Sequence, residues 1–454
     1  VAVRFVADRQ AGDVALELGI RRAYAATRAR CVAVNAGIAG ETDFDLAIVG
    51  GGPVGAAQGA LLLRAGLCRA GRVLLLERDV PSRTWPVPPA QDPADLRVFA
   101  ISRASERILQ HAGVWSALAE QARVISPYER MHVWPASVEP RGAGSLRFDA
   151  AELAEPNLGH IIGNGALQRA ALAAFEAAGG VLREESLQQL NFLADAVELV
   201  TETQTVTTRL VIGADGARSL VRRMAGLGIE SQDYGQLAIV ANLTCQSGHE
   251  NTAWQRFLGE GTLALLPLAS GECSLVWSLP RSKAEGLLAG SVDEFNRAVT
   301  EASDRVIGDL RLASERRSFP LRRVNADRYT RERCALIGDA AHIIHPLAGQ
   351  GVNLGLLDAA SLAEVFEWAI ARGESPGAGI ALRRYERWRK SENELMSFAM
   401  DGINRYLAFG GGAIGALAER GMSLIGRNAT LRRPFALRAL GLEGELPRFA
   451  RRSA

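Results

Sequence analysis

Five residues near the start of the chain have the types and spacing needed to bind a phosphate-containing cofactor. Gly50, Gly52 and Gly55 follow a short run rich in Ile and Val and fit the pattern G-x-G-x-x-G. The first glycine permits a tight turn, the second lets the backbone approach a pyrophosphate, and the third lets the next helix pack on the strand. Pro53 belongs to the same turn, and the following helix would present free N–H groups to phosphate. The next apolar run ends in Glu77, about twenty residues on, where a ribose-binding acid is expected. The stretch therefore predicts a dinucleotide site, with a βαβ unit that binds nothing as the alternative.

Two later motifs pair a glycine with an aspartate directly after an apolar run. They are Asp215 with Gly216, and Gly338 with Asp339. In each case the apolar run would form a strand that brings a glycine and one carboxylate to the edge of a sheet. The glycine-rich turn follows the same logic, so we expect the three motifs to serve one site.

The composition is that of an ordinary globular protein. Of the 454 residues, 48% are hydrophobic and 22% are charged, and the formal net charge is +2. This length predicts two or three domains, and the near-neutral charge gives no reason to expect a nucleic-acid partner. The five cysteines are scattered without a C-x-x-C pair, which argues against a disulfide framework or zinc site. No run of about 18 apolar residues occurs, so we expect no membrane span and a cytoplasmic location.

Strand and helix patterns alternate along most of the chain. Residues 237–279 differ, because four strand-like runs follow one another with turn residues between them, which predicts an antiparallel sheet. Leu158 to Asn164 is expected to open a long helix that continues to Ala178. The residues before Thr42 show no periodic apolar pattern, which indicates a poorly ordered extension.

Five stretches resemble a known family. They are Asp95 to Val98, Gly113 to Trp115, Leu210 to Ser219, Gly338 to His342 and, most specifically, His345 to Gly355. With the glycine-rich turn, they resemble the single-component flavoprotein aromatic hydroxylases, the p-hydroxybenzoate-hydroxylase-like class. Within this class the closest resemblance is to the ubiquinone-biosynthesis flavin hydroxylases, and it covers Phe44 to about Leu442.

The resemblance implies that the cofactor is FAD, and it assigns roles to single residues. Glu77 would hold the adenosine ribose, and Arg97 would contact the cofactor near its phosphates. Asn164 occupies a position whose amide resembles a cofactor contact. The family often carries an acidic residue just before this asparagine, where this chain has Gly163. That departure leaves the local contacts of the helix start open, but not the fold.

Further roles are implied for the two aspartate motifs and a late loop. Asp215 would belong to a motif linked to both FAD and NAD(P)H, and Asp339 would lie near the ribityl chain and pyrophosphate. Asp339 is expected to be a buried carboxylate, which needs hydrogen-bonding partners. Gly351 and Asn353 would approach the isoalloxazine ring, where the chemistry is centred. The predicted cofactor-binding set is Gly50, Gly52, Pro53, Gly55, Glu77, Arg97, Asn164, Asp215, Gly216, Gly338, Asp339, Gly349, Gly351 and Asn353.

The implied fold class is α/β. We expect a glutathione-reductase-type, Rossmann-like FAD-binding domain with an inserted antiparallel-sheet substrate domain and C-terminal helices. The expected boundaries are an extension (1–43), three FAD-binding parts (44–126, 156–228 and 325–395), two substrate-domain parts (127–155 and 229–324) and C-terminal helices (396–454).

Other patterns have simpler explanations. Gly410 to Gly415 also spells G-x-G-x-x-G, and Gly373 to Gly377 spells G-x-S-x-G, but each follows a helical run rather than a strand. Asp339, His342 and His345 have a spacing that could ligate a metal, yet the flavin motif explains Asp339 better, so no metal is expected. His160 is interpreted as a structural hydrogen-bonding residue, and Cys273 and Cys334 as core residues.

The resulting hypothesis is an FAD-dependent monooxygenase. By the resemblance, NAD(P)H would reduce the flavin, and O2 would supply the oxygen atom that hydroxylates a polyprenylated phenol in ubiquinone biosynthesis. An FAD oxidase or dehydrogenase of the same fold and a non-catalytic FAD-binding scaffold are the alternatives. Tyr406 to Leu442 mixes apolar residues with arginines, which suits peripheral contact with the inner membrane or a multi-enzyme complex, and equally an arginine-flanked core helix.

Overall fold

The computed structural model describes residues 42–85, 96–121, 123–142, 144–345, 349–409, 420–422, 437 and 444–452. Nearly all of the expected extension (1–43), the second glycine-rich pattern (410–415) and most of the segment 406–442 therefore lie outside the described residues. No described helix combines the length and apolar character needed to cross a lipid bilayer.

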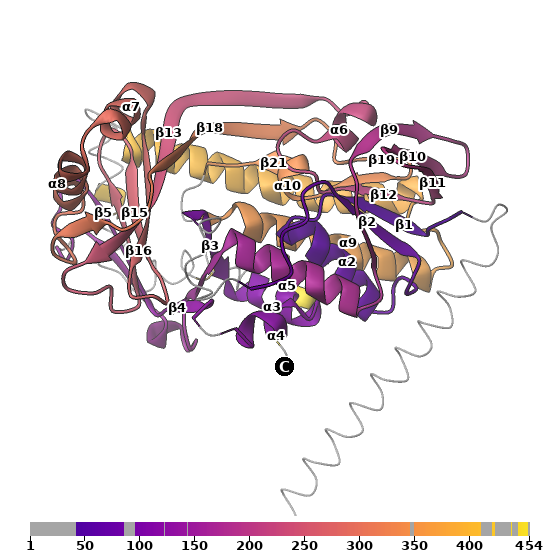
Figure 1. The fold of residues 1–454 in the computed structure, drawn as a ribbon, viewed down its shortest axis with the longest axis horizontal. Coiled ribbons are helices and arrows are strands. Elements are labelled where there is room, and N and C mark those ends of the chain that lie inside the picture. The colour runs from indigo at the N-terminus through magenta and orange to yellow at the C-terminus, as the bar shows by residue number, and fades with distance from the viewer. Residues whose placement is uncertain are drawn as a thin grey trace, which may run out of the picture.

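A six-stranded sheet forms the centre of one half of the molecule (Figure 1). Its order is β19-β20-β12-β1-β2-β8, and all neighbours are parallel except β19 and β20. Its central strands are almost completely buried, as near-continuous apolar runs in parallel sheets usually are. The strands are β1 (Leu46–Val49), β2 (Val73–Glu77), β8 (Val181–Glu184), β12 (Val211–Gly213), β19 (Thr330–Arg331) and β20 (Cys334–Leu336).

Helices and a small antiparallel sheet share one hydrophobic core with this sheet. Close packing between α2 and α5 depends on Gly59, where an added Cβ would lie 2.6 Å from the Phe175 ring. The helices are α2 (Pro53–Arg64), α3 (Arg103–His111), α4 (Val114–Ala119), α5 (Asn164–Ala177), α6 (Leu220–Met224) and α9 (Gly351–Ala371). The small sheet comprises β9 (Leu187–Phe192), β10 (Val197–Thr201) and β11 (Thr205–Thr208).

A second small sheet corrects one expectation from the sequence. Residues expected to open the long helix form the strand β7 (Gly159–Gly163), and α5 begins only at Asn164. The strand lies between β3 (Val98–Ser102) and β4 (Ser126–Tyr128). The apolar pair Ile161 and Ile162 is buried through this pairing, a tertiary contact that overrides local helix preference.

The other half of the molecule contains a nine-stranded sheet with two helices, α7 and α8, on one face (Figure 1). The predicted antiparallel sheet is present, but β5 and β14 run parallel, and β13 begins at Ile229 rather than near Leu237. Residues 229–235 of β13 are largely exposed, so they lack the apolar alternation of a half-buried strand. The elements are β5 (Arg130–Pro135), β6 (Leu146–Asp149), β13 (Ile229–Cys245), β14 (Thr252–Phe257), β15 (Thr262–Pro267), β16 (Cys273–Pro280), β17 (Leu310–Leu312), β18 (Arg317–Ala326), β21 (His342–Ile343), α7 (Arg281–Ala289) and α8 (Val292–Ala302).

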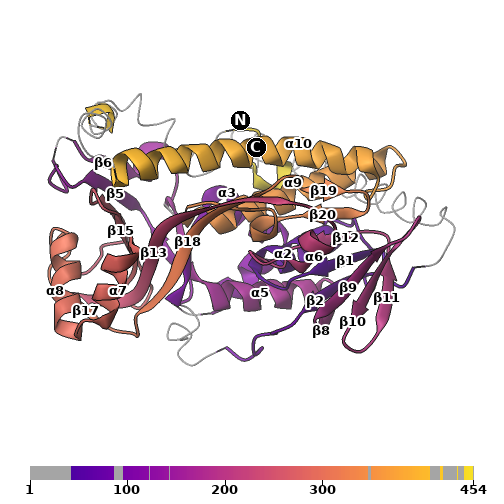
Figure 2. The same ribbon diagram turned by 90° about the horizontal axis from the view of Figure 1, so that it is seen from above.

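Three long elements connect the two halves. The strands β13 and β18 pair with each other within the nine-stranded sheet and extend toward the six-stranded sheet (Figure 2). The helix α10 (Gly379–Ile403) runs along the same side of the molecule. The helix begins near β19, and Met400 and Ile403 at its other end pack with Val133 of β5. A π-helical turn (Asn404–Ala408) continues it, and a 3-10 turn (Arg448–Ala450) returns to the core.

Candidate functional site

The glycine-rich turn between β1 and α2 has the geometry of a phosphate cradle. Gly50 adopts φ +106°, and a Cβ there would lie 2.4 Å from the Ala214 carbonyl oxygen. A Cβ on Gly55 would lie 2.1 Å from the Gly50 carbonyl oxygen, so this glycine is required for close packing. A Cβ on Gly52, in contrast, would meet no atom of the described residues within 4 Å, leaving aside its chain neighbours and nearby helix backbone. The protein thus leaves open the one position where a pyrophosphate is expected.

The start of α2 is electrostatically suited to an anion. Gly52 is the N-cap and Pro53 occupies the first turn, with no side-chain cap and no acidic residue in that turn. The free N–H groups and the positive end of the helix dipole are therefore available to a phosphate. Glu77, at the end of β2, accepts hydrogen bonds from the backbone N–H of Gly51 (2.5 Å) and Asp79 (3.1 Å). These contacts fix its carboxylate beside the cradle.

The Asp215 motif lies directly against the same turn. Asp215 Oδ2 accepts hydrogen bonds from the backbone N–H of Leu220 (2.6 Å) and Val221 (3.1 Å) and so caps α6. Its other oxygen, Oδ1, is buried without a hydrogen-bond partner among the described residues. Gly216 follows with φ +74°. An unpartnered buried carboxylate oxygen is costly, which makes it a candidate acceptor for a ligand hydroxyl.

A buried arginine connects this motif to the Gly338 turn. Arg222 donates hydrogen bonds to the carbonyl oxygens of Ala340 (2.6 Å) and Ala217 (3.0 Å). The structure therefore brings together all three motifs that the sequence singled out, although they are separated by more than a hundred residues.

The Gly338 turn is held by Asp358, a residue that sequence reasoning missed. Asp358 is fully buried on α9 and accepts hydrogen bonds from Gly338 N (3.0 Å) and Asn393 Nδ2 (3.1 Å). It also contacts His342 Nε2 (2.5 Å) and Arg389 Nε (2.8 Å). Burial alone would raise the pKa of Asp358, but the neighbouring His342 and Arg389 lower it to about 2. The only signal in the sequence was an acid among apolar helix residues.

Asp339 differs from the expected buried carboxylate. Its side chain is 38% exposed, and Oδ2 lies 3.9 Å from Arg97 Nη2. The turn of three residues that carries it (Gly338–Ala340) directs it to a cavity instead of into the core. Gly338 has φ +59°, a conformation that glycine adopts without strain.

Asn353 fixes β3, the strand that carries Arg97 at its start. Its side-chain Oδ1 accepts a hydrogen bond from Ser102 N (3.0 Å), and Nδ2 donates to the Ala100 carbonyl oxygen (2.8 Å). Gly349, with φ +64°, lies close to the same strand. The backbone N–H of Asn164 donates to the Arg97 carbonyl oxygen (2.9 Å). These contacts explain how Gly349, the start of α9, β3 and the start of α5 are joined.

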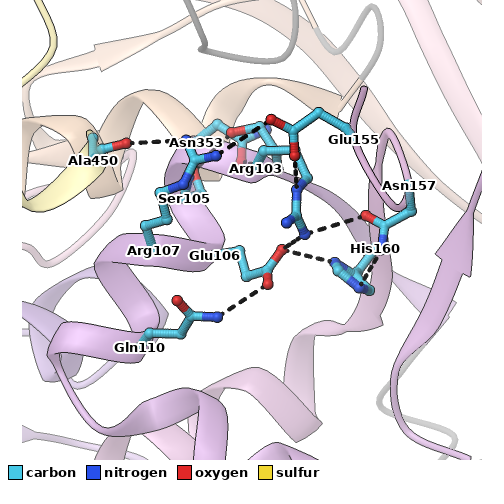
Figure 3. Close-up of polar contacts among 11 residues, drawn as sticks. Arg103, Ser105, Glu106, Arg107, Gln110, Glu155, Asn157, His160, Asn353 and Ala450 are labelled. Atoms are coloured by element: carbon cyan, nitrogen blue, oxygen red, sulfur yellow. Dashed lines mark hydrogen bonds and ion pairs between the residues drawn. The ribbon is translucent and has the colours of Figure 1, made fainter. Parts of the chain in front are cut away.

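A charged cluster joins α3 to residues 155–160 (Figure 3). Arg103 forms ion pairs with Glu106 and with Glu155, whose other oxygen lies 3.6 Å from Arg107. His160 Nε2 and Asn157 Nδ2 are 3.3 Å apart. Burial, reinforced by Arg103, lowers the pKa of His160 to about 4, so the ring is neutral near pH 7. The structural role predicted for His160 is confirmed.

The three residues considered as metal ligands each contact a different partner. His342 bonds to Asp358, His345 Nε2 lies 3.1 Å from Gln236 Oε1, and Asp339 pairs with Arg97. Cys273 and Cys334 are fully buried in β16 and β20, as predicted for core residues.

A cavity of about 560 Å³ extends from Asp339 to the nine-stranded sheet. At one end it is lined by Arg97, Asp339, Gly349 and Gly351, and at the other by strands β13 to β16 and β18. Most of the other lining residues are apolar, including Tyr128, Met131, Phe148 and Leu266. Cavities of this size and character usually take organic ligands.

The residues present fit FAD. The open space at Gly52 and the uncapped start of α2 suit its pyrophosphate, Glu77 suits a ribose, and the free Asp215 oxygen suits a hydroxyl. The cavity extends from the predicted flavin end along an apolar face of the nine-stranded sheet. The fold and site together define a nucleotide-binding flavoprotein.

Comparison with known proteins narrows this class. An FAD binding domain family matches residues 43–391. The 3-demethoxyubiquinol 3-hydroxylase of Escherichia coli is 37% identical over 362 residues, covering 79% of this chain and 88% of that protein. Ubiquinone hydroxylase UbiL of Rhodospirillum rubrum is 33% identical over 413 residues, covering 90% and 92%. In fold, p-nitrophenol 4-monooxygenase PnpA of Pseudomonas putida is similar with a TM-score of 0.70 at 19% identity, covering 89% of this chain and all of that one.

The chain belongs to the family of FAD-dependent monooxygenases that includes the ubiquinone-biosynthesis hydroxylases. The family resemblance and the FAD cofactor predicted from the sequence are confirmed.

Proposed function

We propose that this protein hydroxylates the ring of a polyprenylated phenol in ubiquinone biosynthesis, with NAD(P)H as electron donor and O2 as the source of the oxygen atom. The observation that carries the proposal is a cavity lined at one end by Arg97, Asp339, Gly349 and Gly351 and at the other by an apolar sheet face. The printed names of two relatives, a 3-demethoxyubiquinol 3-hydroxylase and a ubiquinone hydroxylase, support the substrate class.

The proposed division of labour follows from the geometry. When bound, FAD supplies the reductive activation of O2 that no amino-acid side chain provides. Gly50, Gly52, Pro53 and Gly55 cradle the pyrophosphate, and Glu77 binds the adenosine ribose. The apolar cavity orients the ring and keeps bulk water away from the reacting atoms. Burial of a prenyl tail contributes about 0.8 kcal/mol for each methylene removed from water.

The other proposed cofactor-binding residues lie around the glycine-rich turn and Glu77. Asp215 and Gly216 lie against the glycine-rich turn, and Gly338 and Asp339 face the ribityl chain. Gly349 and Gly351 form the wall beside the isoalloxazine, with Asn353 fixing β3 behind them. Arg97, next to Asp339, faces the phosphates, and Asn164 contributes its position at the start of α5.

We extend the proposal to the domain organisation. The FAD-binding domain is of the glutathione-reductase type, and the small sheet β9-β10-β11, placed along the chain between β8 and β12, supports this description. The proposed boundaries are those predicted from the sequence, supported by β5, β6 and β13 to β17 of the nine-stranded sheet, which lie within 127–155 and 229–324. Two strands of this sheet depart from the boundaries, because β18 ends at Ala326 and β21 lies within the third FAD-binding part.

The decisive experiment follows the oxygen atom. Purified holoenzyme is given NAD(P)H, isotopically labelled O2 and a phenol with a short prenyl tail, and the product is analysed by mass spectrometry. One labelled oxygen in the product supports hydroxylation. Substrate oxidised without a gain of oxygen would instead identify an oxidase or dehydrogenase, and absence of substrate-stimulated NAD(P)H oxidation would identify a scaffold.

A peripheral contact with lipid is the proposed way to reach such a substrate. Leu395 and Phe398 lie in the last part of α10 and Tyr406 in the π-helical turn that continues it, and they are 51%, 77% and 43% exposed. Exposed apolar side chains near the end of a long helix suit insertion between lipid headgroups. Phe398→Glu should abolish sedimentation with anionic liposomes while leaving turnover on a short-tailed phenol unchanged. Equal sedimentation of the wild type and Phe398→Glu would overturn the lipid contact. If Phe398→Glu instead loses association with another enzyme, the surface binds a protein partner.

A further inference from the structure

The sheet face that lines the cavity carries three neighbouring polar residues in otherwise apolar surroundings. They are Gln255 of β14, Thr262 of β15 and Ser278 of β16, here called the polar patch. Thr262 pairs directly with Ser278 across the sheet. Gln255 pairs with Ala264, two residues from Thr262 and on the same face. Three adjacent strands therefore bring the patch together.

These side chains are buried, although they line an open cavity. Gln255, Thr262 and Ser278 are 6%, 5% and 4% exposed. The hydroxyl oxygen of Thr262, in a residue that lines the cavity, has almost no accessible area and no hydrogen-bond partner in the part of the chain that the structure describes. Leaving such a group unsatisfied costs about 1–3 kcal/mol. A ligand that hydrogen-bonds this hydroxyl would remove that cost.

The charges around the cavity indicate what kind of ligand fits. Its charged lining residues in the described structure are Arg97, Asp339 and Arg322. Arg97 lies beside Asp339 at the cofactor end, and Arg322 Nε lies 3.6 Å from Asp233. No cation belongs to the polar patch. A carboxylate buried there would lose its hydration without gaining an opposite charge, which is strongly unfavourable.

On this basis, and resting on the proposed function, we propose that the polar patch binds uncharged oxygen substituents of the substrate ring, hydroxyl or methoxy. Gln255 offers both a donor and an acceptor, and each hydroxyl can act as either. The patch therefore selects a neutral oxygenated ring and rejects a ring that carries a carboxylate. Any carboxylate on a precursor would have to be removed or masked by an earlier reaction.

The first test replaces Thr262 by the near-isosteric valine. Dissociation constants are measured from the change in flavin absorbance of the holoenzyme with two probes: a short-tailed prenylphenol and the same molecule with a ring carboxylate. The wild type should prefer the uncharged ring at least about tenfold. Thr262→Val should weaken binding of that ring about fivefold to thirtyfold and leave the FAD content unchanged. Ser274→Ala is the matched control. Ser274 is fully buried on the same strand as Ser278, its hydroxyl has no hydrogen-bond partner among the described residues, and it does not line the cavity.

A second variant tests the charge argument in the opposite direction. Gln255→Arg places a cation within the patch and should shift the preference toward the carboxylated ring. Equal affinities of wild type and Thr262→Val for both probes, or a wild type that prefers the carboxylated ring, would overturn the assignment. The labelled-oxygen experiment on the wild type is independent of these variants. If the wild type transfers labelled oxygen but the patch variants bind both probes as the wild type does, only the patch assignment fails. Absence of oxygen transfer by the wild type would reject the proposed function.

Discussion

Asp358 on α9 and Arg389 on α10 form a buried ion pair, with Arg389 Nε 2.8 Å from Asp358 Oδ1. The other oxygen of the same carboxylate accepts a hydrogen bond from Gly338 N at 3.0 Å. Asp339, the next residue, lines the cavity. A helix distant in sequence thus holds the turn that presents a proposed cofactor ligand.

Asp358→Ala should destabilise the protein by about 3–5 kcal/mol, because it leaves Arg389 buried without its counter-charge. Chemical denaturation measures this loss. Asp309→Ala is the matched control, since Asp309 forms an ion pair with Arg305 in which both side chains are more than half exposed. The control should change the free energy of unfolding by less than about 1 kcal/mol. Similar effects of the two substitutions would show that the buried carboxylate has no special role.

Gly52→Val should remove FAD and leave the fold intact. The new side chain has free space in the protein and would fill the place of the pyrophosphate. Flavin absorbance after purification and the melting temperature report the two effects. Gly55→Val is the contrasting variant: its Cβ would lie 2.1 Å from the Gly50 carbonyl oxygen, so both readings should fall. A yellow Gly52→Val protein would contradict the predicted cradle.

Asp339→Ala should weaken FAD binding and nearly abolish turnover, with little change in melting temperature. The carboxylate is 38% exposed and its contact with Arg97 is long, so the fold gains little from it. Fluorescence titration with FAD and steady-state kinetics measure the effect. Asp233→Ala serves as the control, because Asp233 contacts the lining residue Arg322 but belongs to no cofactor motif. Unchanged flavin affinity in Asp339→Ala would disprove the proposed ligand role.

Acid should begin to destabilise the protein below about pH 6.5 through its buried histidines. Burial lowers the pKa of His132, His160 and His345 from 6.5 to about 4. Between these values the unfolded chain binds more protons than the folded one, so stability falls as the pH drops from 6.5 toward 4. The lowered pKa of Asp358 acts only below 3.8, where the stability it contributes is lost as the pH falls toward 2. The free energy of unfolding, measured by denaturation at several pH values, should therefore change less with pH for His160→Gln than for the wild type. The same pH dependence in both proteins would contradict the lowered pKa of His160.

The sequence predicted features that depend on neighbouring residues. The turn at Gly50 to Gly55 and the acid Glu77 form a local pattern, so both could be recognised before the fold was known. Asp358 could not, because its partners His342, Arg389 and Asn393 lie 16, 31 and 35 residues away. The strand β7 was mistaken for a helix start because its pairing with β3 and β4 has no local signal. The polar patch likewise depends on the register of three strands.

The interleaving of the chain also determines when the cofactor site can form during synthesis. The ribosome releases residues in order from the N-terminus, so the glycine-rich turn is exposed long before β12, β20 and α9 exist. Arg389, which completes the buried pair with Asp358, emerges more than 300 residues after Gly55. A nascent chain therefore cannot assemble the cradle step by step. FAD capture must wait until the residues up to Arg389 have been made, and the early apolar strands must be protected until then.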